Sequence, residues 1–280
     1  MSGTLFVVAT PIGNLEDITL RALRVLRQAD VIAAEDTRRT AKLLAHHGIS
    51  TPMLSFHEHN TRTRVPQLVA RLKAGTSVAV VTDAGTPGIS DPGAELVRAC
   101  IEQGIRIEPI PGASAPLTAA VASGFPLEPL TILGFAPNRS KDRIAFIAGI
   151  YGLKGTVVFF EAPHRILATL TEIANMLGDR PIMVGRELTK AHEEFLHGRA
   201  LDIVGLLPAP RGEFTVVVSP APPTSPSPPT ASPIDIFAEF GQLTQNGASR
   251  RAAIASLARK YGLRSNEIYS IIEKYKMYGQ

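Results

Sequence analysis

Cysteine is nearly absent from this chain of 280 residues. Cys100 is its one cysteine, so no disulfide can form within the chain, and nothing in the sequence indicates an oxidising compartment. No apolar run approaches the roughly 18–20 residues that a bilayer-spanning helix needs. The first apolar run, residues 5–9, has no basic segment before it and is too short for a signal peptide. We therefore expect a cytoplasmic protein with no membrane partner, in which Cys100 is a small buried hydrophobic residue.

Two common nucleotide-binding patterns are also missing. The chain has neither the GxGxxG dinucleotide fingerprint nor the GxxxxGK(S/T) phosphate loop. An NAD-dependent Rossmann enzyme is therefore a distant alternative. The composition, 45% hydrophobic and 19% charged, supports a sizeable core and argues against global disorder. The length suggests about two domains.

Short runs rich in Val and Ile alternate with helical patterns along most of the chain. Such runs are typical of strands buried on both faces, and Asp91-Pro92 and Gly104 are typical of a helix start and a helix end. Because Pro111-Gly112 separates two sets of these elements, we predict an α/β lobe over residues 1–115, with a mainly parallel sheet, and a second α/β lobe over residues 116–218. The expected strands are residues 5–9, 31–34, 78–81, 107–110, 130–133, 156–160, 182–184 and 214–218, and two expected helices lie near 141–150 and 165–177.

A proline-rich segment separates these lobes from the C-terminal part. Residues 219–233 contain seven prolines and no charged residue. That composition cannot pack a core and favours an extended polyproline conformation, at ~3.1 Å per residue. We predict a linker over residues 219–233 and a separate module over residues 234–280.

The C-terminal module has a helical pattern and a basic bias. Ser249 caps one expected helix that ends at Tyr261, and Ser265 caps a second after a short glycine-containing turn. Two helices joined in this way resemble a helix-turn-helix. Residues 234–280 carry seven Lys and Arg against four Asp and Glu, which is compatible with a nucleic-acid contact. A small helical cap on the lobes is the alternative.

Four loops rich in Gly, Pro and polar residues directly follow expected strands. In open α/β sheets ligands bind at the carboxyl ends of strands, and glycines and prolines there expose backbone groups that can face a ligand. Four such loops in succession indicate a binding site between the lobes. They are residues 9–19, 83–93, 111–115 and 160–165.

Seven motifs lie in order between about Leu5 and Val218: ATPIGNLEDIT, AAEDTRRT, HEHN, DAGTPGISDPG, PGASA, EAPHR and RELTKAHEE. Together they closely resemble the ribosomal RNA small subunit methyltransferase I family, of the tetrapyrrole methylase superfamily, and the helical tail is similar to that family's C-terminal module. The resemblance implies a two-lobed tetrapyrrole-methylase fold that transfers a methyl group from S-adenosyl-L-methionine to the ribose 2′-oxygen of a cytidine in the decoding region of 16S rRNA. It also implies the small ribosomal subunit as partner and a symmetric homodimer.

Carried over motif by motif, the resemblance places the methyl donor in the cleft between the lobes. Thr86 stands where tetrapyrrole methylases have the acidic residue of a Gly-Asp-Pro, so the carboxylate contact of the relatives is in doubt here. Pro11 begins the loop that closes over donor or substrate. The donor-binding positions implied are Pro11, Gly85, Thr86, Pro87, Ser114, Ala115, Phe160, Glu161 and Ala162.

The chemistry of this transfer indicates what the chain must supply. A protonated ribose hydroxyl is a poor nucleophile, so a positioned base should help, and in-line alignment with the donor methyl supplies much of the remaining acceleration. The sulfonium is already a good leaving group, so we expect no metal. Glu187 and Lys190 are our candidates for the base; the alternative is a structural ion-pair network with Arg186 and Arg165. Behind these candidates stand Glu58, Glu161, Glu193 and Glu194.

Basic and polar side chains in EDTRRT and HEHN suit contacts with RNA. Asp36, Arg38 and Arg39 of EDTRRT can bind phosphate or orient a loop, since Arg clusters bind phosphate through bidentate hydrogen bonds. A metal site at His57 and His59 is the weaker alternative. The candidate RNA-binding residues are Arg38, Arg39, His57, Glu58, His59, Asn60, Arg62, Arg250 and Arg251.

Two further functions compete with rRNA methylation. A corrin or porphyrin methylase would use the same fold and donor but would act on carbon, and it has no evident use for a tethered basic module. A non-catalytic RNA-binding or ribosome-assembly factor would carry a vestigial donor pocket. The intact Gly- and Pro-rich loops argue against such decay, and a donor-binding measurement separates the two cases.

Overall fold

The computed structural model describes residues 2–88, 91–221, 233–245, 247–261, 263 and 265–277. The chain divides into two compact units, Met1–Ala221 and Pro222–Gln280. Most of the predicted linker, and Gly262 and Arg264 of the predicted helical turn, lie outside the described residues. None of the described helices is long and apolar enough to cross a membrane.

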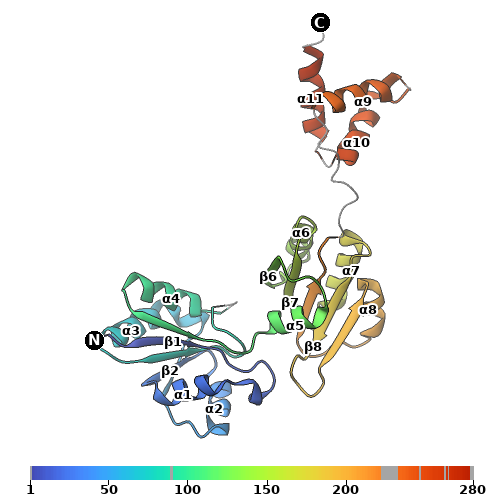
Figure 1. The fold of residues 1–280 in the computed structure, drawn as a ribbon. Coiled ribbons are helices and arrows are strands. Elements are labelled where there is room, and N and C mark those ends of the chain that lie inside the picture. Colours follow the sequence, from blue (N-terminus) through green and yellow to red (C-terminus); the bar gives the residue numbers. More distant parts are fainter. Residues whose placement is uncertain are drawn as a thin grey trace. The chain divides into compact units, whose positions relative to one another are not determined.

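The first sheet, of which Figure 1 labels β1 and β2, is entirely parallel and has the strand order β3-β2-β4-β1-β5. β2 and β4 are buried along their whole length, as their unbroken apolar runs predicted. β3 was not expected from the sequence. The strands are β1 (Thr4–Val8), β2 (Val31–Ala34), β3 (Met53–Ser55), β4 (Val78–Val81) and β5 (Arg106–Ile110).

Helices cover both faces of this sheet, because alternate side chains of each strand point to opposite sides. Val8 and Ile32 pack with α1 and α2, whereas Leu5 and Val7 pack with α3 and α4. Cys100 of α4 is buried in the second of these cores, as expected. The helical elements of this lobe are η1 (Leu15–Asp17), α1 (Leu20–Gln28), α2 (Thr37–His46), η2 (Glu58–Asn60), α3 (Thr61–Lys73) and α4 (Gly93–Glu102).

The second sheet is mixed and has the strand order β6-β7-β10-β8-β9. β6 and β7 are parallel, and the other neighbours are antiparallel. β10 has the predicted bounds and is buried throughout, in the centre of the sheet. β9 was not expected from the sequence. The strands are β6 (Leu130–Phe135), β7 (Thr156–Glu161), β8 (Ile182–Arg186), β9 (Glu194–Gly198) and β10 (Phe214–Val218).

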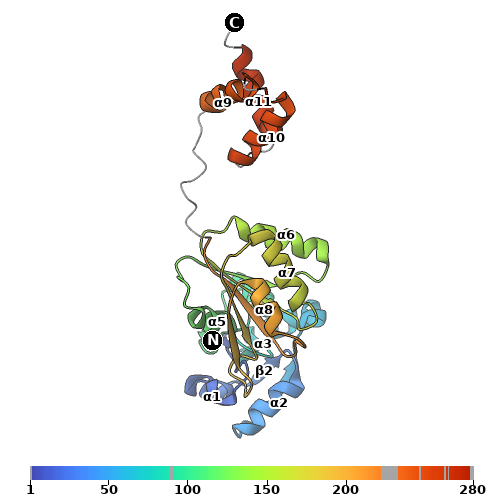
Figure 2. The ribbon, with the colours of Figure 1, turned by 90° about the vertical axis from the view of Figure 1, so that its right-hand side faces the viewer.

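The two faces of the second sheet differ in what covers them (Figure 2). Phe159 and Val216 point into a core shared with α6, α7 and α8. Val158 and Val217 point to the opposite face, which α5 covers together with Ile12 and Leu188. α6 and α7 confirm the two helices predicted in this lobe. The helices are α5 (Ala115–Ser123), α6 (Ser140–Tyr151), α7 (Ile166–Leu177) and α8 (Ala200–Leu206).

The second unit is a small helical module with its own core. The two predicted helices are present, and α9 precedes them, which the sequence had not indicated. Phe240, Leu257 and Ile272 are buried in a core to which all three helices contribute. The helices are α9 (Pro233–Gln245), α10 (Arg250–Tyr261) and α11 (Ser265–Met277). The predicted α/β class, with a parallel first sheet and C-terminal helices, is therefore confirmed.

Candidate functional site

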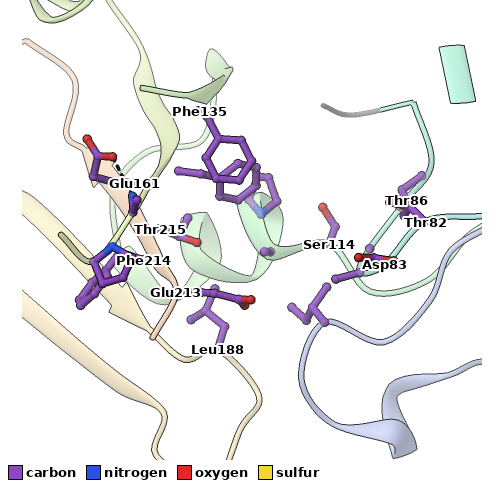
Figure 3. Close-up of a pocket in the computed structure, with 18 of the residues that line it drawn as sticks. Thr82, Asp83, Thr86, Ser114, Phe135, Glu161, Leu188, Glu213, Phe214 and Thr215 are labelled. Atoms are coloured by element: carbon purple, nitrogen blue, oxygen red, sulfur yellow. Dashed lines mark hydrogen bonds between the residues drawn. The ribbon is translucent and has the colours of Figure 1, made fainter. Parts of the chain in front are cut away.

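A cavity of about 430 Å³ lies where the carboxyl ends of β2 and β4 face the second sheet. Residues of both lobes line it: Asp83 and Thr86 lie on the opposite side from Phe214 and Thr215 (Figure 3). A volume of this size is typical of small-molecule sites. The lining residues are Ile12, Glu35, Thr82, Asp83, Ala84, Gly85, Thr86, Ser114, Ala115, Pro116, Phe135, Phe160, Glu161, Ala162, Pro163, Leu188, Glu213, Phe214 and Thr215.

The loop after β4 is held in place by backbone hydrogen bonds to the loop after β1. Thr10 and Gly85 exchange N–H to carbonyl hydrogen bonds of 2.9 and 3.1 Å, and the Thr10 hydroxyl donates to the Thr82 carbonyl at 3.0 Å. Gly85 has φ of +84°, which strains any residue with a Cβ. Farther along, the Asp91 carboxylate accepts from the Gly93 N–H at 2.7 Å, so α4 begins at Gly93, slightly later than predicted.

The loop after β1 also touches the second lobe, at the start of the RELTKAHEE motif. A Cβ on Gly13 would lie 2.5 Å from the Leu188 carbonyl oxygen and 2.6 Å from Lys190 Cγ. Glu187 and Thr189 have φ of +51° and +63°, a conformation that residues other than glycine seldom adopt. Such strained positions cluster at functional sites. Because Leu188 lines the cavity and Gly13 packs against it, this turn closes one side of the cavity against the first lobe.

Aromatic rings form much of the wall on the second-lobe side. Phe135 of β6 and Phe160 of β7 lie with ring centroids 5.0 Å apart, whereas the ring of Phe214, the first residue of β10, is buried in the core with α6, α7 and α8. At the opposite wall, Ser114 precedes α5, and its side chain makes no capping hydrogen bond to the described residues. The cavity thus combines an aromatic end with a polar end.

Glu161 lines the cavity but is fully engaged within the second lobe. Its Oε1 accepts from Arg165 Nε at 2.8 Å and from the Ala162 N–H at 2.7 Å, and its Oε2 accepts from the Thr169 hydroxyl. The Glu161 side chain has no exposed surface. Since a buried carboxylate needs such partners, Glu161 fixes the end of β7 and is not free to act as a base.

Three carboxylates gather at the ends of β2 and β4. Glu35 Oε2 accepts from the Thr82 hydroxyl at 2.6 Å and from the Asp83 N–H at 3.1 Å. Asp83 Oδ1 accepts from the Asp36 N–H at 3.0 Å, and its Oδ2 lies 3.5 Å from the Arg39 guanidinium. Burial, followed by the charge of Glu35, raises the pKa of Asp83 above its ordinary value, although Arg39 partly offsets this.

The predicted base candidates form an ion-pair network at the rim. Lys190 Nζ donates to Glu187 Oε1 at 2.9 Å and to Glu213 Oε2 at 3.1 Å. Burial alone would lower the pKa of Lys190, but these hydrogen bonds outweigh it and leave the pKa raised. Burial would likewise raise the pKa of Glu187, yet its hydrogen bonds from Lys190 and the Glu213 N–H leave the pKa lowered. Both groups are therefore held in their charged forms.

Most of the predicted donor-binding residues line the cavity. Pro11 and Pro87 are not in the lining, but each lies next to a residue that is. Glu187 and Lys190 are also outside the lining. Glu213, which forms a salt bridge with Lys190, is part of it. Sequence reasoning missed Glu35, Asp83 and Glu213 as lining carboxylates. The EDTRRT and DAGTPGISDPG motifs pointed to the first two, but no motif marks Glu213.

The candidate RNA-binding residues of the first lobe follow β2 and β3. These strands pair as far as Ala34 and Ser55, so the segments after them leave the sheet side by side. Arg38 donates to Asp36 at 2.8 Å and holds the pKa of that carboxyl well below its usual range. Asn60 has a structural role, since it accepts from the His57 N–H at 3.0 Å. Glu58, His59 and Arg62 belong to η2 and the start of α3.

The remaining predicted contacts lie elsewhere. Arg250 and Arg251 begin α10, and Arg250 pairs with Glu273 of α11 while its guanidinium lies 5.3 Å from the centroid of the Tyr269 ring. Within the described ranges, no group of three or more His, Cys, Asp or Glu side chains is arranged to hold a metal ion.

Comparisons with known proteins identify the fold and the family of this chain. Residues 4–203 match the family described as Tetrapyrrole (Corrin/Porphyrin) Methylases. A uroporphyrin-III C-methyltransferase from Thermus thermophilus, solved in complex with S-adenosylhomocysteine, has the same fold with a TM-score of 0.55 and 18% identity, over 78% of this chain and 97% of that one.

Two relatives narrow the assignment. The ribosomal RNA small subunit methyltransferase I of Synechocystis sp. is 42% identical over 272 residues, 96% of this chain and 97% of the relative. The protein of the same name from Halalkalibacterium halodurans is 48% identical over 218 residues, 77% of this chain and 75% of the relative. This tetrapyrrole methylase belongs to the ribosomal RNA small subunit methyltransferase I family.

Proposed function

We propose that this protein transfers a methyl group from S-adenosyl-L-methionine to the ribose 2′-oxygen of a cytidine in the decoding region of 16S rRNA. The observation that carries the proposal is the cavity between the lobes, which the family's motifs surround. The names of the relatives supply the rRNA substrate, and the oxygen and the nucleotide follow from the resemblance of the motifs.

The charge of the cavity suits a cationic donor. Four carboxylates line it, and its described lining contains no Lys or Arg. Arg165 neutralises Glu161 and Lys190 pairs with Glu213, so Glu35 and Asp83 contribute most to the potential. A sulfonium is favoured near carboxylates, whereas the pyrophosphate of a dinucleotide would lack a cationic partner. The same charge distribution argues against the NAD-dependent alternative.

The shape of the cavity divides the donor between the two lobes. Phe135 and Phe160 offer apolar surface for an adenine ring, and Ser114 lies where the first N–H groups of α5 are available for a carboxylate. When bound, the donor supplies an activated methyl group. The chain then has to orient that methyl toward the acceptor oxygen and exclude water, which the Gly13 loop and Leu188 are placed to do.

The RNA would reach the cavity across the carboxyl ends of β2 and β3. Arg39 lies 3.5 Å from Asp83 at the cavity wall, and Arg38 is exposed farther out on the same helix. Beyond them, the segment of His57 and His59 follows β3, the neighbouring strand. Guanidinium and imidazole groups in such a row suit phosphates and sugar oxygens.

Methyl transfer to purified small ribosomal subunits tests the function directly. The labelled donor should deposit one methyl group on 16S rRNA, and mapping should locate it on a cytidine ribose. Label on a base, or on a tetrapyrrole and not on RNA, would overturn the proposal. Donor binding without transfer to any RNA would favour an assembly factor.

A further inference from the structure

The cavity needs a group that can take up a proton, because a hydroxyl must lose one as it becomes methylated. The sequence directed attention to Glu187 and Lys190, but these side chains are paired with each other and lie outside the lining. The carboxylates that do line the cavity are Glu35, Asp83, Glu161 and Glu213.

Three of these four carboxylates have other tasks. Both oxygens of Glu161 accept hydrogen bonds inside the second lobe. Glu35 ties β2 to the end of β4 through the Thr82 hydroxyl and the Asp83 N–H. The Glu213 side chain is 70% exposed and pairs with Lys190, so solvent and a cation both stabilise its charge. Glu161 has no free oxygen and Glu213 has no shelter from water, whereas Glu35 accepts both of its hydrogen bonds through Oε2 and serves to hold the ends of β2 and β4 together.

Asp83 has both properties. Its side chain is only 27% exposed, and one oxygen is held by the Asp36 N–H at 3.0 Å. The second oxygen, Oδ2, has a long contact of 3.5 Å with Arg39. Asp83 also lies two residues before Gly85 in the loop that walls the cavity (Figure 3). We infer that Asp83 is the catalytic base, which accepts through Oδ2 the proton that the acceptor hydroxyl loses.

The step balances with no further reactant. The acceptor oxygen forms its bond to the methyl carbon while the carbon–sulfur bond breaks, and that electron pair stays on sulfur. The hydroxyl proton passes to Asp83 Oδ2 and from there to solvent. This inference rests on the proposed function, because it assumes a hydroxyl as methyl acceptor.

The surroundings of Asp83 tune it for this task. The charged groups that face it are Glu35 and Asp36 from the end of β2 and Arg38 and Arg39 from α2. Burial and the two negative charges raise the pKa of Asp83, which makes it a stronger proton acceptor than an exposed carboxylate. Arg39 limits the upward shift.

The test is Asp83→Asn in the full chain, assayed by single-turnover transfer to small ribosomal subunits. Asn keeps an oxygen for the Asp36 N–H but cannot accept the proton. We expect the rate to fall by roughly 10²–10⁴-fold, the usual range for acid–base catalysis. Calorimetric affinity for S-adenosylhomocysteine and the melting temperature should stay close to those of the unaltered protein. Asp179→Asn, a change at an exposed carboxylate in another part of the fold, should leave all three unchanged.

The pH profile provides a second readout. In the unaltered protein the rate should fall as pH falls through the pKa of Asp83, because the protonated carboxyl cannot act as a base, and Asp83→Asn should lose that limb. A wild-type rate in Asp83→Asn, or loss of donor binding or of stability, would overturn the inference. So would the same collapse of rate in Glu213→Gln with Asp83→Asn active. If the unaltered protein itself fails to label rRNA, it is the proposed function that fails.

Discussion

Ala115 is the residue at which a larger side chain tests the donor site most directly, because it would fill the space that the donor needs. It is the first residue of α5 and lines the cavity, and its helical conformation accepts larger side chains without backbone strain. Gly85 is less suitable, because its positive φ would confound lost binding with lost folding. Ala115→Phe should abolish calorimetric binding of S-adenosylhomocysteine, which the unaltered protein should bind at one site per chain.

The matched control lies on the same helix. Val121 is exposed, so Val121→Phe adds a ring to α5 outside the cavity and should leave donor binding intact. If Ala115→Phe binds the ligand as tightly as Val121→Phe, with both proteins folded, the donor does not occupy this cavity.

Lys190 is expected to act through Glu213. Lys190→Met removes the cation between Glu187 and Glu213, and two carboxylates then repel each other at the rim. We expect kcat to fall by roughly tenfold, which corresponds to about 1.4 kcal/mol, with donor affinity nearly constant. Steady-state kinetics of Lys190→Met and Asp83→Asn, measured side by side, compare the losses of kcat in the two variants. A loss as large as that of Asp83→Asn, together with a shifted pH profile, would make Lys190 the base, as the sequence suggested.

Residue types and motifs located the cavity but not its chemistry. Gly85 and Ser114 were found because each follows a strand in a distinctive loop, and Phe160 because it lies at the end of a strand that leads into one. Asp83 and Glu35 are 48 positions apart in the chain, and only the pairing of β2 with β4 brings them together. Glu213 precedes an ordinary apolar strand, and nothing in the sequence near it distinguishes it from a surface carboxylate.

The C-terminal helices can be tested as an element. They have their own core, and their sequence holds seven basic residues against four acidic ones. Truncation after Ala221, the end of the first unit, should raise the apparent KM for the ribosomal substrate and leave donor affinity unchanged. It should also flatten the dependence of binding on salt, because fewer phosphate counterions are released.

A full-length variant separates the effect of the basic charge of the C-terminal helices from the effect of their attachment to the lobes. Arg251 is exposed on α10, so Arg251→Gln should reproduce a small part of the change in salt slope without disturbing the helical core. If truncation instead lowers the melting temperature of the remaining lobes and leaves the salt slope as it was, the helices are a stabilising cap.

Elements with strong periodicity or long apolar runs were predictable, and the others were not. β2, β4 and β10 have the predicted bounds because they are unbroken Val-, Ile- and Ala-rich runs between breakers. β3 spans three half-buried residues and β9 mixes polar with apolar side chains, so neither shows a clear pattern. α5 was missed because its small residues pack closely on the sheet and give no amphipathic stripe.

At the scale of the whole molecule, the predicted symmetric homodimer rests on the resemblance of the motifs alone. Light scattering should give a mass of twice the 29.9 kDa of one chain, independent of concentration over the range in which the protein is active. A constant mass equal to a single chain would contradict the prediction.

The two-lobed architecture was predictable because each of its strands and helices is determined largely by the residues of one short segment. The way the lobes meet was not, since it depends on distant contacts such as Gly13 against Leu188 and Lys190. The cavity lies where the two lobes meet, which is why its lining includes Glu213, a carboxylate that no motif marks.

The carboxylates that line the cavity also bear on how a catalytic cycle ends. Transfer of the methyl group converts a cationic sulfonium into a neutral thioether, so the attraction that draws the donor in disappears from the product at the moment of reaction. Glu35, Asp83 and Glu213 would then hold the spent molecule less firmly than the fresh one. The same wall that favours the cationic donor thus favours release of the neutral product.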